Sequence, residues 1–139
     1  MQKVITVQRR IVAPMAAVWQ VLTNPEALRT GGLGLLRLDG EIRRDGRIAL
    51  ESASAPGRVF RLKVEECAMP RMVWSSGTVL FNGRRSFDVR ETGGGTEFVM
   101  SEVYRGLMLR LIWLSMPDLQ PGFEIFADGV KRLAERVAQ

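Results

Sequence analysis

Glu102 is the polar residue of this sequence with the clearest setting for chemistry. Strand-like alternation puts it on one face with three apolar or aromatic residues, Phe98, Met100 and Tyr104. A carboxylate among apolar side chains must pair with a cation, hold water or become protonated. Three roles therefore stay open: an ion pair with an arginine such as Arg85, contact with a bound molecule, or acid–base catalysis together with Tyr104.

Other common chemistries are excluded by residue type. The chain has no histidine, which removes the commonest general base, the Ser-His-Asp and Cys-His systems and most transition-metal sites. The single cysteine, Cys67, follows Glu65 and Glu66, whose charges disfavour a thiolate. The run Gly93–Gly95 lacks the lysine and helix of a phosphate-binding loop and predicts a hairpin turn. We expect no metal and no cofactor.

Most of the chain has the texture of strands separated by turn residues. After a first strand over 3–12, the expected strands are 35–43, 47–54, 58–68, 71–80, 84–92 and 96–105. Asp45-Gly46 and Asn82-Gly83 are strong signals for two-residue hairpin turns. Connections this short favour antiparallel neighbours. Period-two alternation, as in Phe60, Leu62 and Val64, gives the sheet one apolar face.

Three segments have helical spacing. Two short helices are expected over 14–22 and 24–29, the second with Asn24 as its N-cap. A long helix is expected over 118–137, with Asp118 near its start and Gly129 leaving room for a close approach. Its apolar stripe steps by three and four residues and consists of Leu119, Phe123, Phe126, Val130, Leu133 and Val137.

A sheet with one apolar face and a helix with one apolar stripe must cover each other. We predict a single α+β domain over 1–139, in which a curved seven-stranded antiparallel sheet wraps around the long C-terminal helix. A strongly curved sheet leaves space on its concave side, so a pocket is expected there. Its predicted wall consists of Phe60, Leu62, Trp74, Phe87, Phe98, Met100, Glu102, Tyr104, Phe123, Phe126 and Val130.

The order of these elements resembles the START-related superfamily, also called SRPBCC or helix-grip proteins. The opening segment Ala13-Pro14-x-x-x-Val18-Trp19-x-x-Leu22-Thr23-Asn24-Pro25-Glu26 is similar to the family's start. Later landmarks are Gly83-x-x-x-Phe87, Gly95-Thr96-x-Phe98, Glu102-x-Tyr104-x-Gly106 and Phe123-x-x-Phe126-x-x-Gly129. The likeness covers the whole chain and looks closest to uncharacterised bacterial members of the polyketide cyclase/dehydrase-like branch. It implies the helix-grip fold and an apolar pocket.

Composition and charge limit the partners and the cellular location that we expect for the protein. The net charge is +5, but the 17 arginines are scattered, so we expect solvated strand faces and no nucleic-acid partner. The most apolar run, Leu107–Met116, is ten residues long, about half of a membrane span. No signal-peptide pattern is visible at the N-terminus. We expect a cytoplasmic monomer or homodimer without a membrane partner.

Three functions are compatible with this sequence. The first is binding of a small hydrophobic or amphipathic molecule in the pocket. The second is an enzyme of the cyclase, aromatase or dehydratase type, with Glu102 and Tyr104 as acid–base groups. The third is a protein-interaction module resembling chaperone ATPase activators, marked by an exposed apolar patch. A pocket with two or more convergent polar groups would favour the enzyme, a smooth pocket with one polar group would favour the binding protein, and a filled core would favour the interaction module.

Overall fold

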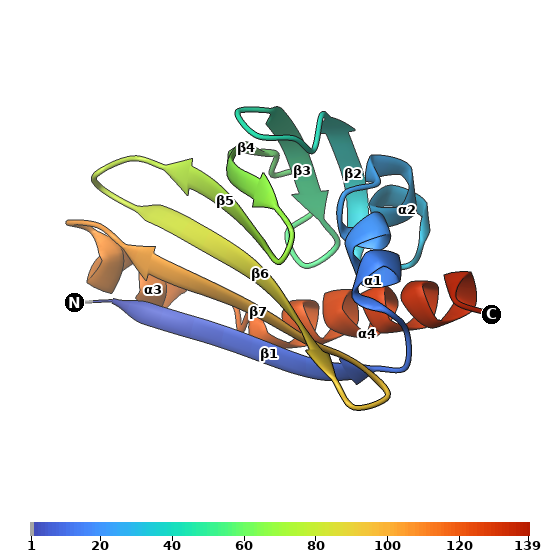
Figure 1. Ribbon diagram of the computed structural model, residues 1–139. Coiled ribbons are helices and arrows are strands. Elements are labelled where there is room, and N and C mark those ends of the chain that lie inside the picture. Colours follow the sequence, from blue (N-terminus) through green and yellow to red (C-terminus); the bar gives the residue numbers. More distant parts are fainter. Residues whose placement is uncertain (1) are drawn as a thin grey trace.

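A curved antiparallel sheet of seven strands wraps around one long helix (Figure 1). The computed structural model describes residues 2–139. The strands follow the spatial order β1-β7-β6-β5-β4-β3-β2, so only the pairing of β1 with β7 joins strands distant in sequence. Their bounds are β1 (Lys3–Ile11), β2 (Leu35–Gly40), β3 (Arg47–Ser52), β4 (Phe60–Ala68), β5 (Arg71–Gly77), β6 (Asn82–Thr92) and β7 (Gly95–Arg105). The predicted helix-grip fold is confirmed.

Four helices complete the fold: α1 (Met15–Leu22), α2 (Pro25–Thr30), α3 (Leu109–Ser115) and α4 (Gln120–Val137). The side-chain oxygen of Asn24 accepts hydrogen bonds from Glu26 N and Ala27 N, at 3.0 and 3.2 Å, which explains the sharp start of α2. Asp118 accepts from Gln120 N at 3.1 Å and so supports the start of α4. Within residues 2–139, no helix is long and apolar enough to cross a membrane.

Four local predictions from the sequence are wrong. Asp45 and Gly46 do not form a two-residue hairpin turn, because the connection between β2 and β3 spans residues 41–46. Asn82 and Gly83 do not form a turn, because β6 already begins at Asn82 and the chain reverses over residues 78–81. The segment 107–116, expected as a linker, contains the helix α3. Val137, expected on the buried stripe of α4, is half exposed, whereas Ala127 and Ala134 are fully buried. The small alanines let α4 approach its neighbours closely, which a search for large apolar residues overlooks.

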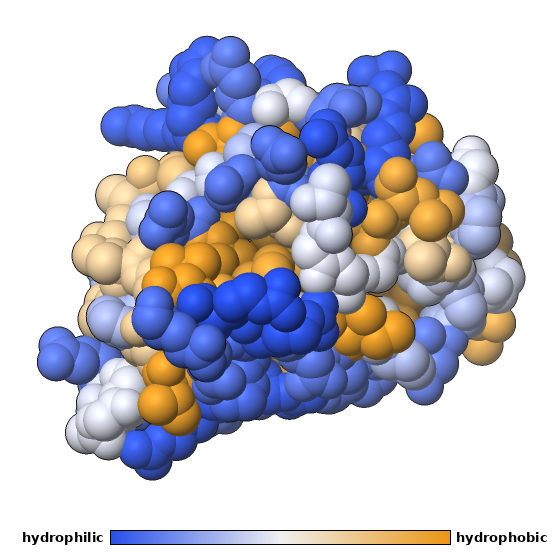
Figure 2. Space-filling model, turned by 90° about the vertical axis from the view of Figure 1, so that its right-hand side faces the viewer, coloured by the Kyte–Doolittle hydropathy of each residue, from blue (hydrophilic) through white to orange (hydrophobic). Residues whose placement is uncertain are grey.

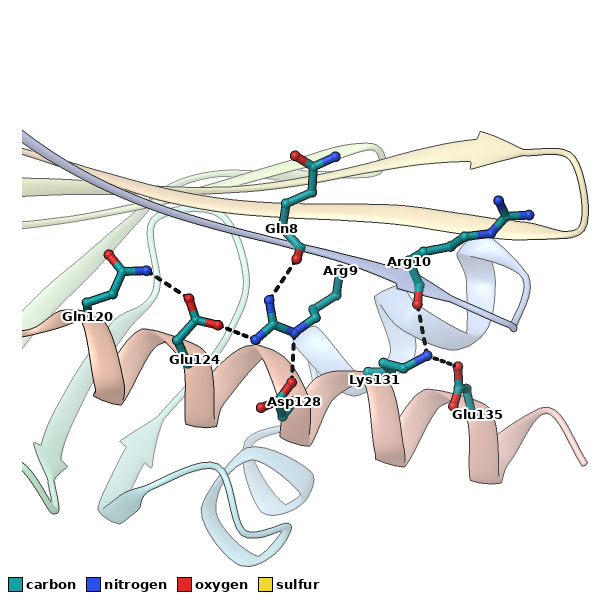
Figure 3. A network of polar contacts seen from close by, with 8 residues as sticks. All are labelled: Gln8, Arg9, Arg10, Gln120, Glu124, Asp128, Lys131 and Glu135. Atoms are coloured by element: carbon teal, nitrogen blue, oxygen red, sulfur yellow. Dashed lines mark hydrogen bonds and ion pairs between the residues drawn. The ribbon is translucent and has the colours of Figure 1, made fainter.

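Polar contacts fasten α4 along the edge strand β1 (Figure 3). The guanidinium of Arg9 pairs with Asp128, at 2.7 Å, and with Glu124. One turn further on, Lys131 Nζ donates to the carbonyl of Arg10 at 2.9 Å. We call these contacts the β1–α4 clamp. They hold one flank of the helix against the sheet.

Exposed apolar residues occur at several places on the surface. On the face turned to the viewer in Figure 2, hydrophobic residues gather in the middle, with hydrophilic residues above and below them. Val12, Leu36 and Ile125 are each at least half exposed. Single exposed apolar residues are normal in globular proteins, so only a group of them carries information.

Candidate functional site

A cavity of about 440 Å³ lies between the concave face of the sheet and the first half of α4. The sheet contributes side chains from β2 to β7, and the segment 116–126 closes the opposite side. Val59 and Phe60, both on the cavity wall, are each 41% exposed, so the cavity opens to solvent beside them. Most of its wall is apolar or aromatic, as expected from the alternation of the strands.

An ion pair between Arg85 and Glu102 lies in this wall. The two residues face each other across β6 and β7, and Arg85 Nε lies 2.6 Å from Glu102 Oε1. Their side chains are only 20% and 12% exposed. Burial opposes the charge of Arg85, but the Glu102 carboxylate outweighs it and raises the pKa of the guanidinium. Of the three roles left open for Glu102, the ion pair with Arg85 is present in the structure.

The Arg85 guanidinium also contacts an aromatic ring of α4. Its central carbon lies 4.5 Å from the centre of the Phe123 ring, which is the geometry of a cation–π contact. Arg85 is therefore held by the sheet through Glu102 and by the helix through Phe123. This double attachment fixes the guanidinium at the cavity wall.

Gly83 makes room for the carboxylate of Glu102. A Cβ atom at this position would lie 2.6 Å from Glu102 Oε2 and 3.5 Å from Tyr104 Cε1. A glycine inside a strand often marks a close approach of this kind. The feature that suggested a turn in the sequence thus serves the ion pair instead.

Tyr104 is the third polar group at this end of the cavity. Its ring stacks on Phe81 at 6.0 Å between ring centres and lies 5.2 Å from the ring of Trp113 in α3. Burial, together with the negative charge of Glu102, raises the pKa of Tyr104 well above its ordinary value. The hydroxyl therefore stays protonated near neutral pH and can donate a hydrogen bond.

The remaining polar groups of the wall are mostly engaged elsewhere. Ser52 and Ser54 share a hydrogen bond of 2.8 Å between their hydroxyls, and Asn82 Nδ2 donates to the carbonyl of Thr78 at 2.9 Å. The buried indole N–H of Trp74 has no hydrogen-bond partner within residues 2–139. The charged and ionisable groups of the cavity thus concentrate at Arg85, Glu102 and Tyr104, apart from the exposed Arg61.

Eight of the eleven predicted pocket residues lie along this wall: Phe60, Leu62, Trp74, Met100, Glu102, Tyr104, Phe123 and Phe126. The other three, Phe87, Phe98 and Val130, are fully buried and do not border the cavity. Phe87 packs behind two wall residues, since its ring centre lies 4.6 Å from that of Trp74 and 6.0 Å from that of Phe126. The helix α1 packs against α4, β6 and β7, and none of its residues borders the cavity.

Several wall residues were not predicted from the sequence. Arg85 was considered only as a partner of Glu102, and Gly83 only as a turn residue and as a landmark of the family resemblance. Ser54, Ala55 and Met116 come from connections, where no alternation indicates which side chain points inward. Cys67 is partly buried, and burial raises the pKa of its thiol, in line with an unreactive residue.

The chain is similar in structure to several solved proteins. A protein of Mesorhizobium loti aligns with a TM-score of 0.76 and 16% identity, over 99% of this chain and 100% of that one. An uncharacterised protein of Rhizobium leguminosarum aligns with a TM-score of 0.70 and 20% identity, over 98% and 96%. Norcoclaurine synthase from Thalictrum flavum, in complex with dopamine and hydroxybenzaldehyde, aligns with a TM-score of 0.72 and 15% identity, over 98% and 88%.

Sequence comparison adds no closer relative. No protein-family model matches the chain. No curated protein sequence matches it either. At identities of 20% or less, the structural likenesses establish the helix-grip fold, and function has to be argued from the cavity itself.

Proposed function

We propose that this protein binds a small amphipathic molecule in the cavity between the sheet and α4. The observation that carries the proposal is an open, largely apolar cavity with its ionisable groups gathered in one place, Arg85, Glu102 and Tyr104. The volume of about 440 Å³ falls in the range of roughly 300–1,000 Å³ that is typical of small-molecule sites.

The chemistry of the wall suggests how such a molecule would lie. Its apolar body would contact the aromatic and aliphatic side chains of Phe60, Leu62 and Phe126. Its polar group would lie at the ion pair, where Arg85 and Tyr104 offer donors and Glu102 offers an acceptor. A neutral group such as a hydroxyl fits this place best, because the two charges of the wall already compensate each other.

An enzyme of the cyclase, aromatase or dehydratase type is the second candidate. The observation in its favour is that Glu102 and Tyr104 converge on one point of the cavity, as acid–base groups would. Membership in the polyketide cyclase/dehydrase-like branch would support the same reading. Against it, Glu102 Oε1 already accepts a hydrogen bond from Arg85 Nε at 2.6 Å, so this oxygen is engaged within the wall. Binding is therefore the proposal we prefer.

The binding proposal can be tested with the fluorescent dye N-phenyl-1-naphthylamine, a neutral probe with an apolar body and one N–H group. Ser76 lies on the cavity wall, and Ser76→Phe would fill part of the cavity. The matched control is Ser75→Phe, the next residue of β5, which alternation places on the opposite face of the sheet. Both variants add the same apolar ring to the same strand.

The expected result is that the wild type and Ser75→Phe bind the dye with similar affinity, whereas Ser76→Phe binds it at least about tenfold more weakly. Circular dichroism would establish that both variants are folded. Equal dye affinity in the two folded variants would place the dye outside the cavity and contradict the proposal.

A further inference from the structure

A group of exposed apolar side chains lies at the end of the molecule where α3 meets the β5–β6 connection. The backbone N–H groups of Leu107 and Met108 donate to the carbonyls of Val79 and Leu80, at 3.0 and 2.8 Å, so the two segments lie side by side. In Figure 1 both are at the end opposite to the C-terminus. We call the group the α3 patch; it consists of Val79, Leu80, Leu107, Met108, Leu111 and Leu114.

The helix α3 is apolar on both sides. Its inner side is packed, with Leu109 fully buried and the Trp113 ring 5.2 Å from Tyr104. Leu111 and Leu114, three residues apart, share the outer side of α3, and Leu107 is exposed just before the helix; Leu107 and Leu114 are 84% and 85% exposed. A surface helix ordinarily turns polar residues outward. The leucines on the outer side therefore indicate a surface that binds another molecule or a membrane.

The α3 patch borders the mouth of the cavity. Phe81, which follows Leu80, and Met116, which follows α3, both belong to the cavity wall. Across the cavity, Val59 and Phe60 are also partly exposed. Whatever covers the patch would thus also lie next to the opening through which a molecule enters.

The charges of the patch favour an anionic partner. Arg110 lies on the exposed side of α3 among the leucines, and Arg105 is exposed just before it. From Val103 to Pro117 and from Thr78 to Asn82 the sequence has no Asp or Glu. A second copy that docked by twofold symmetry would bring the same patch, with its arginines, against itself. On an anionic lipid surface, by contrast, the leucines can insert among the acyl chains and the arginines can pair with the negatively charged headgroups.

We propose that the α3 patch docks on an anionic lipid bilayer and so presents the cavity mouth to the membrane surface. From the sequence we expected no membrane partner, because no segment can span a bilayer; surface docking needs no such segment. Docking does not depend on the content of the cavity, so it stands or falls separately from the binding proposal. If both hold, the bound molecule is one that partitions between the membrane and the cavity.

The test is co-sedimentation with vesicles of phosphatidylcholine alone and of phosphatidylcholine mixed with phosphatidylglycerol. The wild type is expected to bind the mixed vesicles and to bind phosphatidylcholine alone more weakly, with added salt weakening the binding. The double variant Leu111→Gln/Leu114→Gln should lose about tenfold in affinity per leucine. The control is Val137→Gln, an exposed apolar residue at the far end of α4, and it should bind as the wild type does.

Two further measurements complete the test. Arg110→Glu should weaken binding to the mixed vesicles without changing the melting temperature, because the side chain is exposed. Absence of binding to the mixed vesicles, or equal binding by the double-leucine variant, would overturn the proposal. So would light scattering that shows a wild-type dimer and a monomeric double variant, since the patch would then be an interface between copies of this chain. Ser76→Phe and Ser75→Phe both retain the α3 patch, so the difference in dye binding between them bears on the cavity alone.

Discussion

Arg85 and Glu102 determine which polar groups of a bound molecule the cavity can accommodate. Each is largely buried, and each compensates the charge of the other at 2.6 Å. Gly83 supplies the space for the carboxylate, and the Phe123 ring covers the guanidinium. Removing one member of such a pair leaves a buried charge without a partner, which destabilises a protein much more than an exposed pair stabilises it.

The first prediction compares two ion pairs on the same two strands. Glu102→Gln should lower the free energy of unfolding by about 1–3 kcal/mol, because Arg85 stays buried without a counter-charge. The control is Glu97→Gln, whose partner Arg90 is directly across from it but 73% exposed. This change should cost less than about 1 kcal/mol. Urea denaturation of the two variants measures both values.

An equal, small loss of unfolding free energy in both variants would show that water reaches the Arg85–Glu102 pair and the cavity wall around it. A double-mutant cycle with Arg85→Met would then separate the interaction of the pair from the effect of each substitution. A coupling energy near zero would contradict the role given to the pair in fixing the cavity wall.

Among the elements, α4 matters most, because it forms one side of the cavity and is held by contacts on two sides. The β1–α4 clamp fixes the flank at β1 through Arg9 and Lys131. On the side of α2, Leu33 lies over Gly129, where a Cβ atom would be 2.6 Å from Leu33 Cγ. The expectation that Gly129 permits a close approach is thereby confirmed.

The second prediction uses two glycines of the same helix. Gly129→Ala should lower the free energy of unfolding by about 1 kcal/mol or more, because overlap with buried Leu33 outweighs the gain in helix propensity. Gly122→Ala is the control. Its Cβ would meet only Ser54 Oγ at 3.6 Å, so it should be neutral or stabilise by up to about 1 kcal/mol. If both variants are stabilised, Leu33 does not pack on Gly129 as described.

Much of the element order could be predicted from the sequence, because alternation and the stripe of α4 are long, regular signals. The helix α3 could not, since its seven residues are apolar on both sides and show no helical stripe. Asn82-Gly83 was wrongly predicted as a turn. In the sequence, a strand glycine that leaves space for a neighbouring side chain cannot be distinguished from a turn glycine. The β1–α4 clamp also escaped prediction, because Arg9 and Asp128 are 119 residues apart.

The cavity residues that could be predicted from the sequence are those that lie on strands. Alternation led to Trp74, Met100 and Glu102, which lie on the cavity wall. It could not tell that Phe87 and Phe98 are fully buried and do not border the cavity, because alternation gives the face of a strand residue but not its depth in the core. The boundary between core and cavity is a property of the whole packing, not of any one strand.

At the scale of the whole molecule, acid should weaken the fold through the contacts of α4. Hydrogen bonds from Arg9 lower the pKa of Glu124, and one from Lys131 lowers that of Glu135. A carboxylate whose pKa is lower in the folded state contributes stability above its unfolded pKa of about 4.3, and this is lost as the pH falls through the folded value. The melting temperature should therefore drop below about pH 4.5.

A variant tests the origin of this acid response. Arg9→Gln removes the main cause of the lowered pKa of Glu124, so its melting temperature should fall less steeply with acid than that of the wild type. Arg37→Gln, which removes an exposed ion pair within β2, is the control and should follow the wild type. Parallel curves for Arg9→Gln and the wild type would mean that the clamp does not supply the acid-sensitive stability.

Binding of a small amphipathic molecule in the cavity is the central proposal for this protein. The most direct measurement is native mass spectrometry of the protein purified from its own host, for the wild type and the Ser76→Phe and Ser75→Phe variants. We predict a bound mass of a few hundred daltons, as a cavity of about 440 Å³ allows, on the wild type and on Ser75→Phe but not on Ser76→Phe. No added mass on any form, or the same mass on all three, would contradict the claim.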